Sequence, residues 1–279
     1  MITSSRFRGF RASLLVACLG VAACSQGFQT RKYTSTPALF VAAKAEFNKK
    51  KWDNAITGFE RLTLDLSARD TLLPLAHYYL GQAHDKRGEH LLAAQSFNRL
   101  AESFSDDTLA DDALFAAGES YAAMWRDPQL DPTYGDLAQS QYRLLGSLYP
   151  DSPLKPKADA AVLHIDELKA SKDYETGQHY VRRRAFDSAI IYYKDVVRNY
   201  PATNKSRDAM LRIVEVYRRP EMNYKEEAKE MCTALIGAYP GDKDVAKLCP
   251  PERAAATDSV LAKPAPAKPA PAKPKKPAV

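Results

Sequence analysis

The 279-residue sequence predicts an all-α fold, a superhelical solenoid of about five stacked helical hairpins. The first observation is a repeated stop signal: Tyr-Pro followed by small or polar residues ends a helical run at Pro150, Pro201 and Pro240. Proline ends helices because it lacks an amide hydrogen and clashes with the preceding turn. The second observation is an alanine twelve residues before each proline. The third is the residue four positions after each alanine, aromatic in the first two copies and Cys232 in the last.

The same spacing recurs upstream, where serine replaces proline in two copies: Ala55, Phe59 and Ser67, then Ala93, Phe97 and Ser105. Gly81 and Gly177 lie twelve residues before their alanines, whereas Gly118 lies twenty before Ala138 because "WRDPQLDPTYGD" is inserted. Small residues, an aromatic and a final proline at these spacings are landmarks of the tetratricopeptide repeat, a helical hairpin of about 34 residues. We expect the small residues to let the two helices approach closely and the aromatic to fill the gap to the next hairpin.

The first 23 residues predict an export signal. A basic start precedes an apolar run over 12–21, too short to span a membrane, and small residues precede Cys24. The stretch "VAAC" is similar to a bacterial lipobox, so Cys24 is predicted to carry the lipid, with 24–36 as the linker. An ordinary signal peptide with an incidental cysteine is the alternative. Ser25 rather than Asp follows the cysteine, which by the lipoprotein sorting rule implies the outer membrane.

Hydrophobic periodicity and the stop signals predict the helices in pairs. The expected pairs are 37–49 with 52–66, 73–87 with 90–104, 109–124 with 134–148, 155–184 with 186–199, and 204–218 with 224–238. The helix over 155–184 reads either as continuous or as broken near Lys172. We group them into N-terminal repeats one to three over 37–150 and C-terminal repeats four and five over 151–249.

The last segment, 250–279, contains "KPAPAKPAPAKPKKP" and predicts a disordered, extended tail. A spacer is the simpler interpretation, and a basic strand that binds acidic lipid head groups, peptidoglycan or a partner protein is the other. Two cysteines remain in the exported body. Because the compartment is oxidising, we predict a disulfide between Cys232 and Cys249, with two buried free thiols as the alternative.

Charge and motifs exclude several classes of function. The net charge of +6 comes from the two ends of the chain. Between residues 24 and 252 there are 31 basic and 33 acidic side chains. A nearly neutral body argues against nucleic-acid binding. Five scattered histidines match no metal-binding spacing, and neither a GxSxG motif nor a phosphate-binding glycine loop occurs. We therefore expect no enzyme, no metal and no cofactor, and a function in binding.

The first helices of the first three hairpins are the expected binding surface. With Gly81 as the eighth position of its repeat, the groove-facing residues are Phe40, Lys44, Tyr78, Gln82, Phe115 and Glu119. An aromatic beside a polar residue, three times over, suits an extended or strand-like peptide with aromatic side chains. A register error of one residue would instead bury these aromatics between repeats.

Over roughly residues 24 to 242 the chain resembles the BamD family, outer-membrane lipoproteins of the β-barrel assembly machine. The ordered set "RDPQ" (126–129), "YPDSPLKPKADAA", "HYVRRRAFDSAI" and "VVRNYPATNKSRDAM" carries the resemblance, together with the lipobox. It implies a non-enzymatic scaffold, lipid-anchored at the periplasmic face of the outer membrane. The C-terminal repeats would hold a POTRA domain of the barrel protein BamA, and the N-terminal repeats would receive the C-terminal signal strand of unfolded barrel proteins. Other Bam lipoproteins stay open as partners.

By position, the resemblance assigns the BamA-facing surface to Arg182, Arg183, Tyr192, Lys194, Arg198 and Arg212. The chain departs from the family at Tyr192, where relatives commonly carry an arginine, and in its tail and its cysteine pair. The alternative function is a tetratricopeptide cell-envelope adaptor, similar to a pilotin or a Tol- or peptidoglycan-associated lipoprotein, that uses the basic tail on peptidoglycan.

Overall fold

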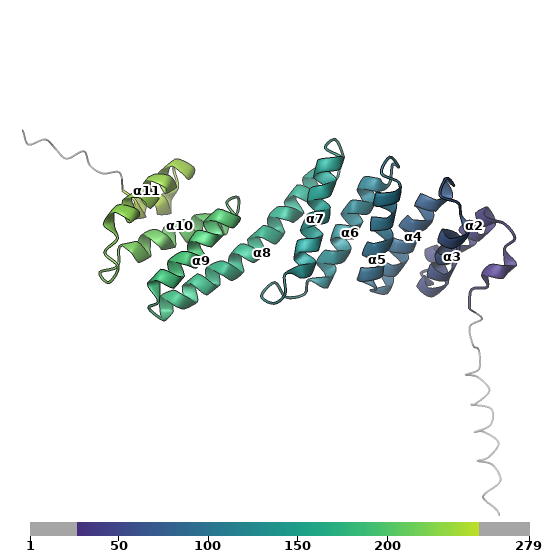
Figure 1. The fold of residues 1–279 in the computed structure, drawn as a ribbon, viewed down its shortest axis with the longest axis horizontal. Coiled ribbons are helices and arrows are strands. Elements are labelled where there is room, and N and C mark those ends of the chain that lie inside the picture. Colours follow the sequence, from purple (N-terminus) through teal and green to yellow (C-terminus); the bar gives the residue numbers. More distant parts are fainter. Residues whose placement is uncertain (1–26, 251–279) are drawn as a thin grey trace, which may run out of the picture. The chain divides into compact units, whose positions relative to one another are not determined.

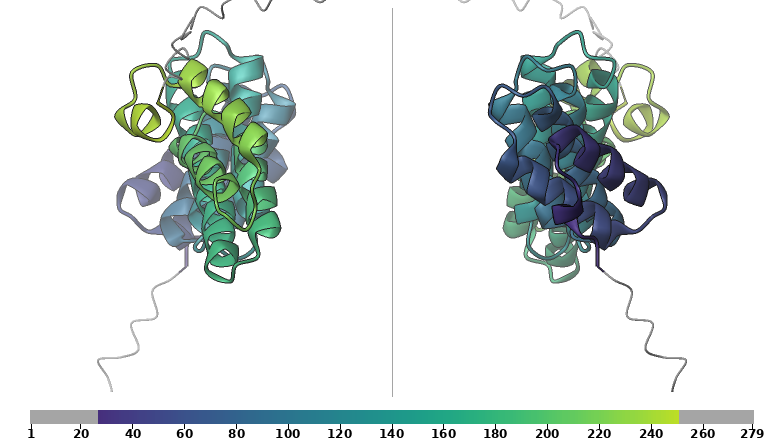
Figure 2. Two further views of the ribbon diagram at one scale, coloured as in Figure 1. Left: turned by 90° about the vertical axis from the view of Figure 1, so that its left-hand side faces the viewer. Right: turned by 90° about the vertical axis from the view of Figure 1, so that its right-hand side faces the viewer.

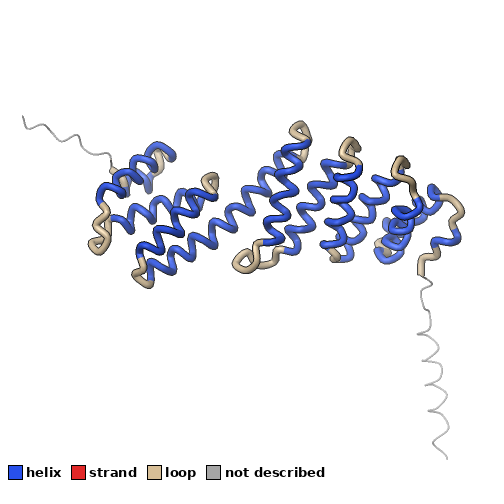
Figure 3. Tube along the Cα trace, in the orientation of Figure 1, coloured by secondary structure: helices blue, strands red, loops and turns tan. Residues whose placement is uncertain are grey.

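The computed structural model describes residues 27–250, and over that range it consists of helices and connecting loops without a strand (Figures 1 and 3). The predicted all-α class is therefore confirmed. The elements are η2 (Thr30–Lys32), α2 (Thr36–Asn48), α3 (Trp52–Asp65), α4 (Leu72–Arg87), α5 (His90–Ser103), α6 (Ala110–Met124), α7 (Thr133–Leu148), α8 (Lys155–Arg182), α9 (Phe186–Asn199), α10 (Asn204–Tyr217), α11 (Lys225–Ala238) and α12 (Lys243–Leu248).

The predicted helices are all present, with ends within two residues of the expected positions. Helix α8 is continuous, which settles the alternative left open near Lys172. The short elements η2 and α12 were not predicted. Helix α12 begins where the Asp242 carboxylate accepts hydrogen bonds from the amides of Asp244 and Val245. None of the helices in the described part of the chain combines the length and apolar character needed to cross a bilayer.

The described residues belong to two compact units, the first ending at Ala209 and the second beginning at Met210. The boundary lies inside α10. The division predicted from the sequence, repeats one to three over 37–150 and repeats four and five over 151–249, was based on the repeats and not on contacts. It stays a prediction. Cys24 and the Lys/Pro/Ala-rich tail lie outside the described residues.

In the first unit the hairpins follow one another in chain order, with α3 packed on α4, α5 on α6 and α7 on α8 (Figure 1). In the right-hand view of Figure 2, α2 and α3, in purple and dark blue, lie in front of the later hairpins of this unit. The stop signals tie neighbouring hairpins together. The Tyr149 hydroxyl donates to the carbonyl oxygen of Ser105 at 2.7 Å, and the Ser152 hydroxyl donates to the Asp111 carboxylate at 2.5 Å. The connection between α7 and α8 is thereby bonded to the connection before α6 and to the first turn of α6.

Close approach of the two helices within a hairpin depends on glycine. A Cβ added to Gly81, Gly118 or Gly177 would lie 2.5–2.7 Å from the ring of Phe97, Tyr142 or Tyr193, respectively. Each ring belongs to the second helix of the same hairpin. We expected the aromatics at this position to fill the gap to the next hairpin. Phe59 does so by stacking on Tyr79, whereas the rings of Phe97, Tyr142 and Tyr193 also fill the hollow that the missing Cβ leaves within their own hairpin.

The turns inside the hairpins share a second feature. Lys50, Arg184 and Asn223 have positive φ angles of 59°, 61° and 52°, and Gly88 has a φ of 88°. Each of these residues lies two positions before the second helix of its hairpin. At Lys50, Gly88 and Arg184 the left-handed conformation follows the end of the first helix within two residues. It is unfavourable for a residue with a Cβ.

The second unit is held by aromatic, polar and covalent contacts. The rings of Tyr217 and Tyr224 meet edge to face at 5.6 Å. A disulfide joins Cys232 in α11 to Cys249 after α12, with the two Cα atoms 5.4 Å apart. The Arg218 guanidinium donates to the Leu248 carbonyl oxygen at 2.5 Å. These contacts fix α12 to the end of α10 and to α11.

Candidate functional site

The predicted groove residues lie on the first helices α2, α4 and α6, at equivalent positions of three successive hairpins. Phe40 does not face solvent. It is 9% exposed, and its ring meets Phe59 at 5.8 Å and Tyr79 at 6.0 Å. Phe40 lies three residues before the fully buried Ala43, so both belong to the helix face that packs on the core. The prediction of Phe40 as a groove residue was therefore wrong.

Lys44 lies at the surface of α2, half-buried, with its ammonium 5.0 Å from the ring centre of Tyr79. Tyr79 in turn stacks on Phe59, with ring centres 5.5 Å apart. The aromatic partner of Lys44 is thus Tyr79, which the sequence reasoning missed. The signal was present as the pair Tyr78-Tyr79, because two adjacent tyrosines on a helix point to different faces.

Tyr78 and Gln82 are both half-buried on α4. The Tyr78 ring packs edge-on against Phe97 at 5.7 Å. Burial raises the pKa of Tyr78, the nearby Asp112 carboxylate adds to the rise, and a hydrogen bond with the Gln82 side chain opposes it. Burial, then Asp111, also raises the pKa of Asp112. Tyr78 therefore keeps its proton and can donate a hydrogen bond to a ligand.

Phe115 and Glu119 complete the series on α6. Phe115 is half-buried, with its ring centre 5.5 Å from that of Tyr142. Glu119 is exposed, and its carboxylate accepts a hydrogen bond from the Tyr142 hydroxyl. Burial, and then this bond, raise the pKa of Tyr142 above its usual range. The carboxylate is therefore held in place beside the aromatic ring.

The surface formed by Lys44, Tyr79, Tyr78, Gln82, Phe115 and Glu119 is called the first-helix surface below. It combines aromatic edges with one cation, one amide and one carboxylate, which suits recognition of a peptide. Among the described residues, no group of three or more His, Cys, Asp and Glu side chains is placed to hold a metal ion.

The insertion between α6 and α7 is tied to α8. The Lys172 ammonium donates to the carbonyl oxygen of Leu130 at 2.9 Å, and the Gln129 amide donates to the Glu175 carboxylate at 3.3 Å. Asp131 accepts from both the backbone amide and the hydroxyl of Thr133. The "RDPQ" stretch is thus fixed against the next hairpin.

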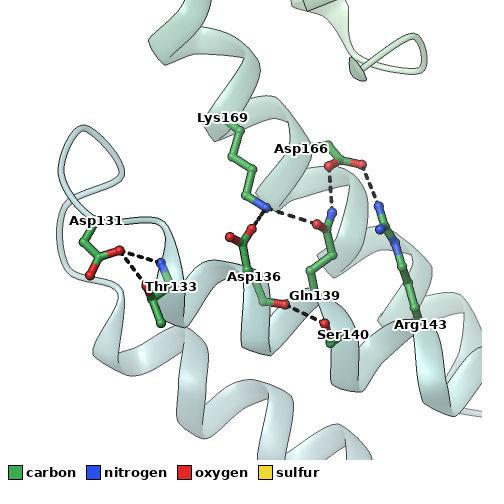
Figure 4. Close-up of polar contacts among 8 residues, drawn as sticks. All are labelled: Asp131, Thr133, Asp136, Gln139, Ser140, Arg143, Asp166 and Lys169. Atoms are coloured by element: carbon green, nitrogen blue, oxygen red, sulfur yellow. Dashed lines mark hydrogen bonds and ion pairs between the residues drawn. The ribbon is translucent and has the colours of Figure 1, made fainter. Parts of the chain in front are cut away.

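A polar network joins α7 to α8 (Figure 4). The buried Gln139 donates to Asp166 at 2.6 Å and accepts from Lys169 at 3.1 Å. Lys169 also pairs with Asp136, and Arg143 lies 3.7 Å from Asp166. Each buried polar group of this network has a partner, so it sets the register of α8 on α7.

The residues predicted to face BamA divide between the two units. Arg182 and Arg183 are exposed at the C-terminal end of α8. On α9, Tyr192 stacks on Tyr180 with ring centres 5.3 Å apart, and the charge of Tyr180 contributes most to a raised pKa of Tyr192.

The other three residues of that set are charged. Lys194 is exposed on α9, and Arg198 pairs with Asp195. Arg212 lies on α10 in the second unit, where it pairs with Glu215 at 2.6 Å. A half-buried tyrosine stack with exposed arginines on the same hairpin is typical of protein interfaces.

Comparison with known proteins gives one family match. The model of the YfiO family, described as an outer membrane lipoprotein, matches residues 33–233. The outer membrane protein assembly factor BamD of Caulobacter vibrioides is 23% identical over 241 residues, covering 83% of this chain and 76% of that protein. The Rickettsia prowazekii protein of the same name is 23% identical over 131 residues, covering 47% of this chain and 51% of its own.

Solved structures with similar folds carry tetratricopeptide repeats. A TPR repeats protein from Bacteroides fragilis is 13% identical with a TM-score of 0.45, covering 78% of this chain and 97% of its own. The TPR2AB domain of yeast Sti1 is 12% identical with a TM-score of 0.41, covering 77% and 81%. The family match, by contrast, begins before α2 and ends within α11, and so includes every surface residue described above.

Proposed function

The chain belongs to the family of YfiO outer membrane lipoproteins, and from that membership we propose that it is a scaffold of outer-membrane β-barrel assembly. In this role it binds a BamA-like barrel protein and unfolded barrel proteins without altering them chemically. The family match over residues 33–233 carries the proposal, and two relatives named as outer membrane protein assembly factors support it.

The first-helix surface is the proposed site for unfolded barrel proteins. Its aromatic edges would pack on the aromatic side chains of an extended strand, while Lys44, Gln82 and Glu119 would bind polar groups of the peptide. The correction at Phe40 changes the test, because replacing a core residue would unfold the hairpin rather than probe binding.

The test uses a fluorescent peptide that represents a barrel-protein C-terminal strand ending in an aromatic residue. We expect Lys44→Ala combined with Gln82→Ala to weaken binding about tenfold, which corresponds to about 1.4 kcal/mol. The exposed Gln95→Ala on α5 is the matched control and is expected to leave binding unchanged. Equal affinities of the double variant and the unaltered protein would exclude this surface.

The proposed BamA-binding residues are Arg182, Arg183 and Tyr192 on the fourth hairpin and, separately, Arg212 in the second unit. A pull-down from solubilised outer membrane should recover a barrel protein with POTRA domains. We expect Arg182→Glu with Arg183→Glu to reduce that recovery at least fivefold, because rim charges control association. Arg69→Glu, on the exposed connection between α3 and α4, is the control.

We also propose that Cys24 carries a lipid that holds the protein at the periplasmic face of the outer membrane. Several acyl chains give firm anchoring because each buried methylene adds about 0.8 kcal/mol. Cys24→Ser should move the protein from the membrane pellet to the soluble fraction after cell lysis. Retention of this variant in the pellet would contradict lipid anchoring.

The composition of the tail favours one alternative, a cell-envelope adaptor that binds peptidoglycan through its lysines. Co-sedimentation of the full chain and of a chain ending at Pro250 with purified sacculi separates the two functions. Tail-dependent sedimentation together with failure to recover a barrel protein would support the adaptor.

A further inference from the structure

An open cavity of about 460 Å³ lies between the second and third hairpins of the first unit. The turn between α4 and α5 forms one wall, and the end of α6 with the start of the insertion forms the other. Figure 3 shows that this turn and the insertion loop lie at the same edge of the stacked hairpins, opposite the connections between hairpins. The residues the argument uses are Glu89, His90, Leu91, Leu92, Met124 and Arg126.

The walls of this cavity are largely apolar. Leu91 and Leu92 are each 43% exposed, although they are adjacent residues in the first turn of α5. Met124, at the end of α6, is half-buried on the opposite wall. Adjacent exposed leucines facing a methionine form a surface that an apolar side chain can cover, and methionine adapts to different shapes.

The charged groups of the turn are already paired. The Glu89 carboxylate lies 2.8 Å from Nδ1 of His84 and 3.5 Å from Nε of Arg87. The His90 Nδ1 lies 3.0 Å from the Asp85 carboxylate. These contacts hold the wall in place and leave neither Glu89 nor His90 in need of a partner from outside.

Arg126 is different. It is exposed at the mouth of the cavity, and its guanidinium forms no ion pair with any residue between 27 and 250. The loop that carries it is nonetheless fixed, because Asp127 accepts from the Gln129 amide at 2.9 Å and Leu130 is bonded to Lys172. The cavity therefore presents one positive charge, free of an internal partner, on a positioned loop.

We propose that this cavity binds an internal segment of a partner protein in which an acidic side chain lies next to a large apolar one. The apolar side chain packs on Leu91, Leu92 and Met124. The carboxylate pairs with the planar guanidinium of Arg126, which can donate two parallel hydrogen bonds. Because the cavity is open rather than enclosed, a continuous chain can pass through it. This site differs from the first-helix surface and from the arginines of the fourth hairpin.

The test uses the full mature chain in detergent micelles with labelled leucine and methionine methyl groups. The probe is a blocked peptide, acetyl-Ser-Gly-Leu-Asp-Phe-Gly-Ser-amide, titrated while the methyl signals of Leu91, Leu92 and Met124 are followed by NMR. We expect saturable shifts of these signals. A peptide with asparagine in place of aspartate should bind at least fivefold more weakly.

Variants complete the experiment. Arg126→Gln should weaken binding at least fivefold, whereas Arg69→Gln, an exposed arginine outside the cavity, should leave it unchanged. The proposal is overturned if the three methyl signals do not move, if the asparagine peptide binds equally well, or if binding requires a free peptide C-terminus. Such a failure is distinguishable from failure of the proposed function, because the pull-down of a barrel protein does not depend on this cavity.

Discussion

The ring of Tyr193 lies so close over Gly177 that a Cβ atom added there would stand 2.6 Å from the ring carbon Cε1. Tyr193 is 1% exposed, so its ring has no room to move away. Gly177→Ala should therefore lower the free energy of unfolding by about 1–3 kcal/mol through overpacking. Urea denaturation followed by circular dichroism measures the loss.

Gly146→Ala is the matched control for that substitution. Gly146 is also helical, but the nearest atom to an added Cβ is 3.8 Å away. Alanine is the better helix former, so this variant should be unchanged or more stable by up to about 1 kcal/mol. If both variants lost stability equally, close packing would not explain the glycine at 177.

At the turn residue Arg184 we expect a substitution to glycine to raise the stability. Its φ of 61° is unfavourable for a residue with a Cβ, whereas glycine adopts it freely. Arg184→Gly should raise the thermal midpoint, with a gain of up to about 1 kcal/mol. Arg183→Gly, one residue earlier with a φ of −84°, serves as control and should not stabilise the protein. A lower midpoint for Arg184→Gly would show that contacts of the arginine side chain stabilise the fold by more than its positive φ destabilises it.

Stability should also depend on the protonation of His77. Burial, and then the charge of Arg99, lower the pKa of His77 to about 4 in the folded state. The unfolded chain binds this proton at a pKa near 6.5, so the contribution of neutral His77 is fully present above that value. It is lost as the pH falls from about 6.5 toward 4.

Because His77 is only partly shielded from solvent, we expect a loss of about 1 kcal/mol between pH 7 and pH 5. The measurement is the urea midpoint at both pH values. His77→Gln should show a smaller change over the same interval. An NMR titration that placed the His77 pKa near 6.5 would remove the basis for this prediction.

The network of Figure 4 predicts a contrast between two side chains of α7. Gln139→Met removes one hydrogen-bond partner from each of Asp166 and Lys169, and should cost about 1–2 kcal/mol because partly buried polar groups lose a hydrogen bond. Arg143→Met removes an exposed ion pair at 3.7 Å and should change stability by less than about 0.5 kcal/mol. Both are measured by urea denaturation. Similar effects of the two variants would mean that Gln139 does not set the register.

The sequence could predict the helices because the signals that define them are local. The hydrophobic period, the alanine and the proline twelve residues later lie within one helix or directly after it, so each pattern can be read without the rest of the fold. Helix α12, which was missed, also had a local signal, because Asp242 precedes a short polar run. This helix follows the last hairpin, so the repeat pattern did not indicate it. The burial of Phe40 depends on Tyr79, which lies in a different hairpin.

The cavity near Arg126 could not be predicted for the same reason. Its walls come from residues 88–92 and 123–126, which no periodic pattern links. The left-handed turn residues were also missed, because only one of the four is glycine.

Helix α8 serves two hairpins with one continuous backbone. Its middle is bonded to α7 through Asp166 and Lys169, and its C-terminal part holds Gly177 under Tyr193 of α9. At 1.5 Å per residue, its 28 residues form a continuous helix about 42 Å long. A continuous helix resists bending because bending stretches its internal hydrogen bonds. A partner that tilts one half of α8 therefore tilts the other half by the same angle. Within this unit, α8 therefore transmits a rotation of the third hairpin to the turn before α9.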